Sequence, residues 1–308
     1  MASIITITAN PCIDISTHVP KLIPEKKLHC TTMKKEPGGG GINVSRVIKR
    51  LGGNTKAIYL AGGYTGDYFT KMLHAEWVDT LVIEIENHTR ENFVVAEGDT
   101  NLQYRFGMPG PYVKENEWMK CLDELSSLYA MEYIVASGSL TTGIPTDFFA
   151  RVAAIANQKR ARVVLDTSGE ALVAALDEGV YMIKPNLGEL AFIAGVDELD
   201  NTTAIEAARW VIAKKRCEIV VVSMGARGAL LVTAKKAEHV TAPAVKIKST
   251  VGAGDSMVAG IVLALSENKT TKEALQYGVA CGTAATMNEG TALCNEADVA
   301  YLLKLIKK

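Results

Sequence analysis

Short β-branched runs alternate along most of the chain with stretches whose apolar residues recur at helical spacing. The runs predict strands at residues 4–8, 56–61, 133–137, 162–166, 181–184 and 218–223. Between most neighbouring runs lies a segment with a helical pattern, which is the arrangement of βαβ units. The pattern therefore predicts an α/β fold with a mostly parallel central sheet covered by helices on both faces.

Two regions interrupt this alternation. Residues 13–36 and 86–110 are strand-like with no helical pattern between their halves, and the turn-forming residues 98–101 predict a hairpin in the second region. Such strands cannot join the central sheet as βαβ units, so we expect a small antiparallel sheet that projects from the main body. The length of 308 residues allows one large α/β domain or two smaller ones, and the chain shows no low-complexity tract and no internal repeat. We expect one domain over residues 1–308 that carries this sheet as a subdomain.

Composition narrows the classes of partner. Lys plus Arg (33) nearly balance Asp plus Glu (34), so no long-range field favours nucleic acid or an anionic membrane. No apolar run reaches the ~18 residues that span a bilayer, and the N-terminal residues lack the charged region of a signal peptide. The six cysteines are scattered without C-x-x-C or metal-ligand spacing. We expect a cytoplasmic protein with reduced cysteines and neither nucleic-acid nor membrane partners.

The most informative motif is the run Ser-Thr-Val-Gly-Ala-Gly-Asp-Ser-Met at 249–257, which an apolar helical stretch follows. Gly252, Ala253 and Gly254 leave backbone N–H groups uncovered where the helix begins, and these groups favour an anion. Asp255 then sits in the first turn. Donors for a charge with a base beside them are what phosphoryl transfer needs. The motif predicts an anion hole with Asp255 as general base; a glycine-rich turn with a first-turn acid is the alternative.

A second motif, Asn186-x-x-Glu189, opens a predicted helix. The spacing of three places both side chains on one helix face, where they could hold Mg²⁺ through its water ligands. A helix N-cap with a first-turn acid fits this spacing equally well. The residues alone leave both interpretations open.

Four consecutive glycines at 38–41 precede a helical stretch at 42–51 and suggest a dinucleotide-binding loop. The residues before them are polar (Lys34, Lys35, Glu36), whereas that motif follows an apolar strand. No acidic residue ends a second strand about 20 residues further on. The sequence therefore disfavours a nucleotide-dependent oxidoreductase.

Several motifs occur together in the order of one known family. They lie at residues 10–14 (Asn-Pro-Cys-Ile-Asp), 36–44, 137–140, 166–172, 184–189, 249–257 and 288–291. On these motifs the sequence resembles the PfkB (ribokinase-like) carbohydrate kinases from residue 3 to about residue 300, and within them most closely the bacterial enzymes that phosphorylate fructose 6-phosphate. The resemblance implies a ribokinase-like three-layer α/β/α fold, with the small antiparallel sheet as a lid over the sugar and as the interface of a homodimer.

The same resemblance implies an activity: ATP-dependent phosphorylation of the 1-hydroxyl of fructose 6-phosphate to fructose 1,6-bisphosphate, a step of glycolysis. Relatives that act on tagatose 6-phosphate or fructose 1-phosphate tend to have Lys third in the glycine run, where this chain has Gly40. Those two substrates are the alternative, and a neutral sugar or nucleoside comes after them. A binding protein without catalysis would be expected to lack Asp255, Asn186 or Glu189, and all three are present.

On the sugar side, the resemblance implies roles for polar residues, glycines and cations of the lid. A lone Asp after a strand is ordinarily a turn residue, and exposed strand charges usually protect a sheet edge. A sugar phosphate, however, needs about 2–3 charge-assisted donors, and Arg offers a planar fork for it. The implied sugar-binding residues are Asp14, Lys27, Gly39, Gly40, Asn43, Arg90, Arg105 and Ser139.

On the nucleotide side, the turn at 223–228 alone requires only two glycines, but in the family this segment lies along the nucleotide. The implied nucleotide-binding residues are Lys184, Asn186, Ser223, Gly225, Gly228, Thr250 and Asn288, with Asn288 and Gly290 closing over adenine. The implied metals are Mg²⁺ with ATP, held through water by Asn186 and Glu189, and an activating K⁺. The K⁺ would lie on backbone carbonyls of Ser249, Val251, Ala285, Asn288 and Gly290.

The resemblance also bears on regulation. Relatives in this part of the family bind a second, inhibitory ATP near the lid, with Tyr at the position of Ile23 and Arg at that of His29. Ile23 offers no aromatic face for stacking, and His29 is mostly neutral above pH ~6.5. Lys27 remains as a cation. We expect weak or absent inhibition by ATP.

Overall fold

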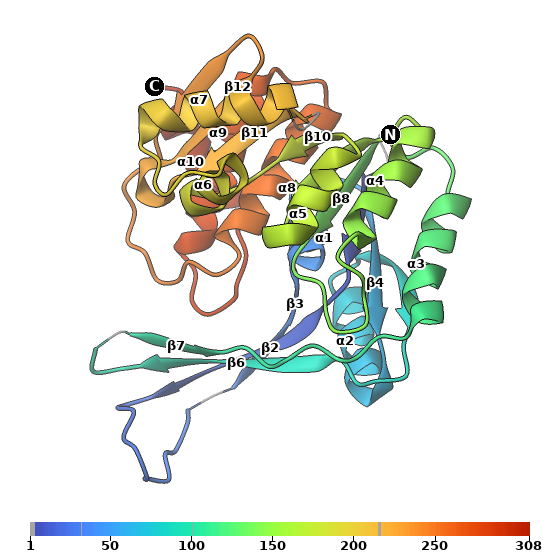
Figure 1. The fold of residues 1–308 in the computed structure, drawn as a ribbon. Coiled ribbons are helices and arrows are strands. Elements are labelled where there is room, and N and C mark those ends of the chain that lie inside the picture. Colours follow the sequence, from blue (N-terminus) through green and yellow to red (C-terminus); the bar gives the residue numbers. More distant parts are fainter. Residues whose placement is uncertain (1–3, 32, 101, 215–216) are drawn as a thin grey trace.

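The computed structural model describes residues 4–31, 33–100, 102–214 and 217–308. A nine-stranded sheet runs through the described part in the order β13-β12-β11-β10-β9-β8-β1-β4-β5 (Figure 1). All neighbouring pairs from β11 to β5 are parallel, and β12 and β13 add an antiparallel edge. Its strands are β1 (Ile4–Thr8), β4 (Thr55–Ala61), β5 (Asp79–Glu84), β8 (Tyr133–Ser137), β9 (Arg162–Asp166), β10 (Val180–Ile183), β11 (Cys217–Ser223), β12 (Ala229–Thr233) and β13 (Ala237–Val240).

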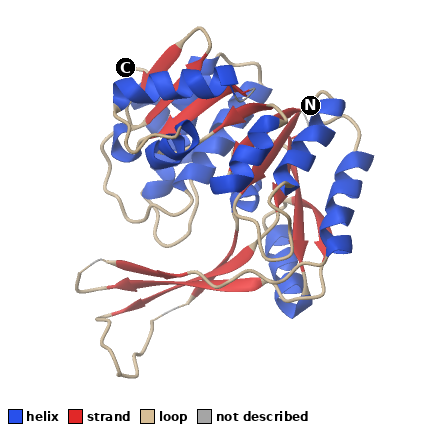
Figure 2. Cartoon of the chain, in the orientation of Figure 1, coloured by secondary structure: helices blue, strands red, loops and turns tan. Residues whose placement is uncertain are grey.

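Helices pack on both faces of this sheet, so the main body has three layers (Figure 2). One face is covered by α3 (Glu115–Ser127), α4 (Phe148–Gln158), α5 (Gly169–Asp177), α6 (Leu187–Ala194) and α7 (Asn201–Lys214). The other is covered by α1 (Gly40–Arg50), α8 (Ala253–Ser266), α9 (Thr271–Thr286) and α10 (Glu296–Ile306). The helix α2 (Gly63–Ala75) packs beside β4 and β5, and a short 3₁₀ turn spans Gly225–Arg227.

The period of two along each strand explains the two cores. In β8, Ile134 and Ala136 face the core beneath α3–α7, whereas Tyr133 and Val135 face the core beneath α1 and α8–α10. Successive strand residues point to opposite faces, so a strand covered on both sides is apolar throughout. This is why the central strands appear in the sequence as continuous β-branched runs.

A second, four-stranded sheet projects from the main body (Figure 1). Its order is β3-β2-β6-β7, formed by β2 (Cys12–Val19), β3 (Lys34–Gly38), β6 (Arg90–Glu97) and β7 (Gln103–Phe106). We call it the lid. It is antiparallel within each half, and the two halves meet in a parallel pairing of β2 with β6. The expected hairpin joins β6 to β7; Asn101 in its turn lies outside the described residues.

The predicted α/β fold with a small projecting sheet is confirmed, and all six predicted strands are present to within a residue or so. The pattern missed β5, β12 and β13. The edge strand β5 is only partly buried, and β12 follows β11 through a short 3₁₀ turn with no α-helix between them. In the described residues, no helix combines the length and apolar character needed to cross a bilayer.

Candidate active site

The start of α8 lies where the sequence places an anion hole. Gly252 is the N-cap residue and adopts a left-handed conformation (φ 73°), and a β-carbon there would approach Leu293 Cδ2 to 2.6 Å. Both facts require glycine. Ala253 and Gly254 form the first turn with Asp255, so backbone N–H groups and a carboxylate share one helix end.

Asp255 is partly buried and accepts a hydrogen bond from Asn43 Nδ2 of α1 at 2.8 Å. Burial and the nearby Asp166 carboxylate raise the pKa of Asp255 to about 7, against the lowering effects of the Asn43 bond and Lys184. A carboxylate with a pKa near neutrality is suited to accept a proton from a hydroxyl group. The geometry agrees with the role of general base expected from the sequence.

Lys184 extends from the end of β10 to the same place. Its Nζ lies 3.0 Å from Asp166 Oδ1 and 3.4 Å from where a β-carbon of Gly254 would stand. Burial opposes the charged form, but the nearby carboxylates, chiefly Asp166, outweigh it and raise the pKa of Lys184. Lys184 is therefore a buried cation beside the anion hole, as expected for a phosphate ligand.

Four of the seven nucleotide residues implied by the resemblance line a cavity of about 540 Å³, which Lys184, Asn186 and Asn288 do not line. Ser223, Gly225, Gly228 and Thr250 line it together with Ala253 and Gly254. Ala226 of the 223–228 turn and Met257 of the 249–257 run also line it. The other walls come from residues of 242–247 and α9 that the sequence analysis did not single out: Ala242, Pro243, Ala244, Val245, Ile247, Val279, Gly282, Thr283 and Thr286. No motif marks them, because any apolar residue of the right size can form such a wall.

Asn288 lies elsewhere. It lines a neighbouring cavity of about 810 Å³ beneath the lid, together with Gly290, and its Nδ2 donates to the carbonyls of Ala284 and Leu293. The structure thus does not bring Asn288 into the lining of the nucleotide cavity, since both amide hydrogens hold the turn after α9. We had expected this residue to close over adenine.

The Asn186-x-x-Glu189 motif forms a capping box at the start of α6. Asn186 Oδ1 accepts from Glu189 N at 2.9 Å, and Glu189 Oε2 accepts from Asn186 N at 2.8 Å. Glu189, Asp166 and Asp255 all act electrostatically on Lys184, so three carboxylates surround the phosphate side of the site. Few direct protein oxygens beside a phosphate position suit Mg²⁺, which retains most of its waters.

The two segments that would supply carbonyls for K⁺ meet beside the anion hole. Ser249 Oγ donates to the Gly290 carbonyl at 2.6 Å, and the backbone N–H groups of Lys248 and Ser249 donate to the Thr286 carbonyl. These bonds hold residues 248–251 against the turn that follows α9. Backbone carbonyls are neutral oxygens, which suit a monovalent cation, so the K⁺ site between these two segments stays a prediction.

The sugar side is formed by one face of the lid. Register places Asp14 beside Glu36 and Asn92, and Asn92 Nδ2 donates to Asp14 Oδ1 at 3.2 Å. Burial raises the pKa of Asp14, while hydrogen bonds from Cys12 and Asn92 oppose the shift. A β-carbon on Gly38 would collide with the Asp14 carboxylate, so glycine is required beside this acid.

The rest of the glycine run packs against the ends of β1 and β8. A β-carbon on Gly40 would collide with Ser137 Oγ and the Gly138 amide, and Gly39 has a φ of 114°. Asn10 Nδ2 donates to Ser139 Oγ at 3.2 Å, and Arg90 donates to the carbonyls of Asn10 and Met108. Ser139 and Arg90 thus both contact Asn10, one through its side chain and the other through its carbonyl; their role as phosphate ligands stays a prediction.

Several polar atoms beside the glycine run and Asn10 are buried without a protein partner. Among the described residues they include Thr8 Oγ1, Asn10 Oδ1, Arg90 Nε and Ser137 Oγ. Buried polar atoms are normally paired, and an unpaired group costs about 1–3 kcal/mol.

The two remaining lid cations lie apart from Arg90. Arg105 donates from Nη2 to Thr250 Oγ1 at 3.1 Å, so it reaches across to the segment before the anion hole. Lys27 is exposed in the loop between β2 and β3, which hangs from the lid (Figure 1). The described chain therefore gathers one of the three expected cations at Ser139 and places a second near the phosphoryl-transfer position.

Comparison with known proteins decides the family. The model of the pfkB family carbohydrate kinases matches residues 3–298. The chain belongs to this family. The ATP-dependent 6-phosphofructokinase isozyme 2 of Escherichia coli is 40% identical over 299 residues, covering 97% of each chain. The 1-phosphofructokinase of Bacillus subtilis is 34% identical over 304 residues, covering 99% of this chain and 98% of that one.

Solved structures agree with this membership. Phosphofructokinase-2 from Escherichia coli in complex with potassium superimposes with a TM-score of 0.96 at 38% identity, over 100% of both chains. The expected ribokinase-like fold of this pfkB-family chain is thus confirmed. Sequence reasoning did not assign a role to Asp166, which pairs with Lys184; the available signal was an acid at the carboxyl end of a buried strand.

Proposed function

We propose that this pfkB-family kinase transfers the γ-phosphoryl group of ATP to the 1-hydroxyl of fructose 6-phosphate, giving fructose 1,6-bisphosphate and ADP. The observation that carries the proposal is the position of Asp255. It shares the first turn of α8 with Ala253 and Gly254, which line the nucleotide cavity, while its carboxylate contacts Asn43 on the sugar side. A carboxylate between the two pockets is where a kinase needs its base.

The chemistry follows from this position. The sugar O1 attacks the γ-phosphorus as its proton passes to Asp255, the new O1–P bond forms, and the bond to the β-phosphate oxygen breaks to release ADP. The N–H groups of Gly252, Ala253 and Gly254 hold the charge that develops on the transferring group. Lys184 adds a buried positive charge beside them.

Two metals complete the proposal. Asn186 and Glu189 would hold Mg²⁺ through its waters, and the carbonyls of Ser249, Val251, Ala285, Asn288 and Gly290 would hold K⁺. When bound, these ions supply positive charge to the phosphates and to the anion hole. The solved Escherichia coli relative that contains potassium supports the second assignment.

The sugar pocket favours fructose 6-phosphate over the alternatives. Asp14, Gly39, Gly40 and Asn43 would bind the ring, while Ser139 and the lid cations Arg90, Arg105 and Lys27 bind phosphate groups. Gly40 has no space for a side chain, so the Lys found at this position in other relatives would not fit here without movement. A structure of the Escherichia coli relative with fructose 6-phosphate supports this choice. Tagatose 6-phosphate and fructose 1-phosphate remain the alternative substrates.

We also propose a homodimer through the lid, within a single kinase domain. The lid face opposite Asp14 carries large apolar side chains: Phe93 pairs with Phe106 and Val95 with Tyr104, and all but Val95 are more than a third exposed. Such a face is normally covered in an assembly. A structure of the Escherichia coli relative is described as a tetrameric inhibited form, so sedimentation must measure how many copies associate.

An activity panel tests the proposed function. Purified protein with Mg²⁺-ATP and K⁺ is given fructose 6-phosphate, tagatose 6-phosphate, fructose 1-phosphate and free fructose, and ADP release is followed. We expect the highest kcat/KM with fructose 6-phosphate. A higher kcat/KM for tagatose 6-phosphate or fructose 1-phosphate would make that compound the preferred substrate. No turnover with any of the four sugars would refute the kinase assignment.

A further inference from the structure

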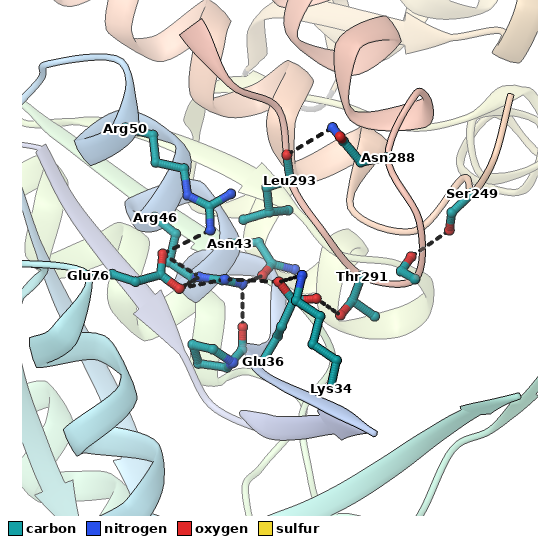
Figure 3. Close-up of polar contacts among 12 residues, drawn as sticks. Lys34, Glu36, Asn43, Arg46, Arg50, Glu76, Ser249, Asn288, Thr291 and Leu293 are labelled. Carbon is teal, nitrogen blue, oxygen red and sulfur yellow. Dashed lines mark hydrogen bonds and ion pairs between the residues drawn. The ribbon is translucent and has the colours of Figure 1, made fainter. Parts of the chain in front are cut away.

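A guanidinium group lies buried beneath the sugar pocket and takes no part in the chemistry above. Arg46 of α1 is 1% exposed. Its Nε and Nη2 donate to Glu76 Oε1 at 3.0 and 2.6 Å, as Figure 3 shows. Glu76 ends α2, and burial of its carboxylate is outweighed by Arg46 and Arg50, so its pKa is lowered. This two-point bond fixes the plane of the guanidinium.

The other edge of Arg46 faces the active site. Nη1 donates to the Pro37 carbonyl at 2.6 Å, and Pro37 stands directly before the glycine run. The same nitrogen lies 3.5 Å from Asn43 Oδ1, the longest of these contacts. Asn43 and Arg46 are three residues apart on α1, so they share a helix face. One side chain thus contacts both the wall of the sugar pocket and the residue that contacts Asp255.

This contact decides which way the Asn43 amide points. Arg46 has only N–H groups to offer, so the amide oxygen of Asn43 must face it. The amide NH₂ then points to Asp255, where it donates to Oδ2 at 2.8 Å. With the amide reversed, its oxygen would face a carboxylate and its NH₂ would face a cation.

A second acid completes the surroundings of Arg46. Glu36 Oε1 lies 3.7 Å from Arg46 Nη2 and 3.0 Å from Lys34 Nζ, and Glu36 Oε2 accepts from Thr291 Oγ1 at 2.9 Å (Figure 3). Burying such charges is costly, and apolar side chains of similar volume often give equal stability. Stability alone is therefore a weak reason for this network.

We infer that Arg46 is a positioning residue for phosphoryl transfer, which presents the Asn43 NH₂ group to Asp255 and fixes the Pro37 carbonyl at the base of the glycine run. The inference rests on the proposed function. Arg46 touches neither Asp255 nor the nucleotide cavity in the described contacts, so it would act through Asn43 and Pro37.

The inference predicts a change in pH dependence. The charged groups that act on Asp255 are Asp166 at the end of β9, Lys184 after β10 and Asp14 on β2. A substitution at Arg46 leaves all three of these residues in place. The Asn43 bond lowers the pKa of Asp255. Losing that bond raises this pKa, so a higher pH is needed to ionise the base.

The test variant is Arg46→Lys, which keeps the positive charge that also acts on Asp14 but loses the planar fork. We expect kcat/KM for fructose 6-phosphate to fall by about tenfold or more, because small misplacements at a reacting centre have effects of this size. The acid limb of its pH profile should move to higher pH, and the KM for ATP should stay unchanged.

The matched control is Arg50→Gln. Arg50 donates to the same Glu76 carboxylate at 3.0 Å but contacts neither Pro37 nor Asn43 in the described hydrogen bonds, so its loss should leave the pH profile unchanged. In an Asn43→Ala background, Arg46→Lys should lower kcat much less than in the wild type, because residues that act through one another are not additive.

If Arg46→Lys does not fold, the pair Arg46→Gln/Glu76→Gln removes both charges together and serves in its place. A folded variant whose kcat/KM and acid limb match the wild type would overturn the inference, as would full additivity with Asn43→Ala. An inactive wild type in the substrate panel would instead overturn the proposed function.

Discussion

The nucleotide side of this site is formed mainly by backbone and apolar groups, whereas the sugar side is formed mainly by polar and charged side chains. The nucleotide cavity is lined by glycine, alanine and apolar residues, and its anion hole is main chain. The sugar side depends on charged and amide side chains from the lid and α1, supported from below by the Arg46–Glu76 pair. A main-chain site depends little on which side chains the sequence supplies, whereas side chains can be exchanged by mutation, so we expect substrate preference to depend on the sugar side.

The largest effect is expected from a substitution of Asp255, which lies where the nucleotide side and the sugar side meet. Asp255→Asn should lower kcat by about 10²–10⁴-fold or more, because Asn keeps the shape of the side chain without its basicity. Affinities for ATP and fructose 6-phosphate should stay nearly intact, which calorimetry of the variant would show. A kcat within about tenfold of the wild type would contradict the catalytic assignment.

A change on the sugar side alone comes next. Arg90→Ala should raise the KM for fructose 6-phosphate and reduce the preference for it over free fructose by about 10-fold or more, since a hydrogen bond to a charged group contributes about 1.5–3 kcal/mol. The matched variant Arg90→Lys keeps the charge and should lose less. If free fructose already has the higher kcat/KM in the wild type, the assignment of Arg90 to a phosphate-binding site is wrong.

The pH profile sharpens the comparison by reporting on Asp255 itself. Because burial and Asp166 raise its pKa to about 7, the base is protonated below neutrality and ionised above it. The kcat/KM for fructose 6-phosphate should therefore fall by about tenfold per pH unit on the acid side and level off above pH ~7. A profile that stays flat well below neutrality would show that Asp255 ionises near its ordinary pKa.

Potassium tests the nucleotide side without any mutation. A cation on the carbonyls near Ser249 and Gly290 would strengthen the field at the anion hole, so activity should be higher in sodium-free potassium buffer than in choline buffer. Equal rates in the two buffers would refute the cation site.

The smallest expected effect concerns inhibition by ATP. Ile23 is exposed on the lid loop and cannot stack on adenine as an aromatic residue would, and such stacking contributes about 1–3 kcal/mol per base. Initial rates at low fructose 6-phosphate should therefore fall little as ATP rises with magnesium in excess. A pronounced fall would show that Lys27 and its neighbours still form the second nucleotide site, and Ile23→Tyr should then deepen it.

The sequence by itself determined the central strands, the helix start at Gly252 and the first-turn position of Asp255. These depend on local rules: apolar runs for buried strands, and glycine where φ is positive. The family motifs also identified Lys184, Asn43 and Asp14 as site residues. All three act on Asp255, Asn43 through a hydrogen bond and the other two through their charges, which agrees with that resemblance.

The tertiary structure alone decided which side chains meet. The Asp166–Lys184 pair joins the ends of two strands, and the Arg46–Glu76 pair joins two helices. No motif or residue spacing in the sequence predicts either ion pair. It also placed Asn288 outside the nucleotide cavity and turned Arg105 toward Thr250. Local patterns fix backbone conformation because it depends on neighbouring residues, whereas a buried ion pair depends on the packing of elements far apart in the chain.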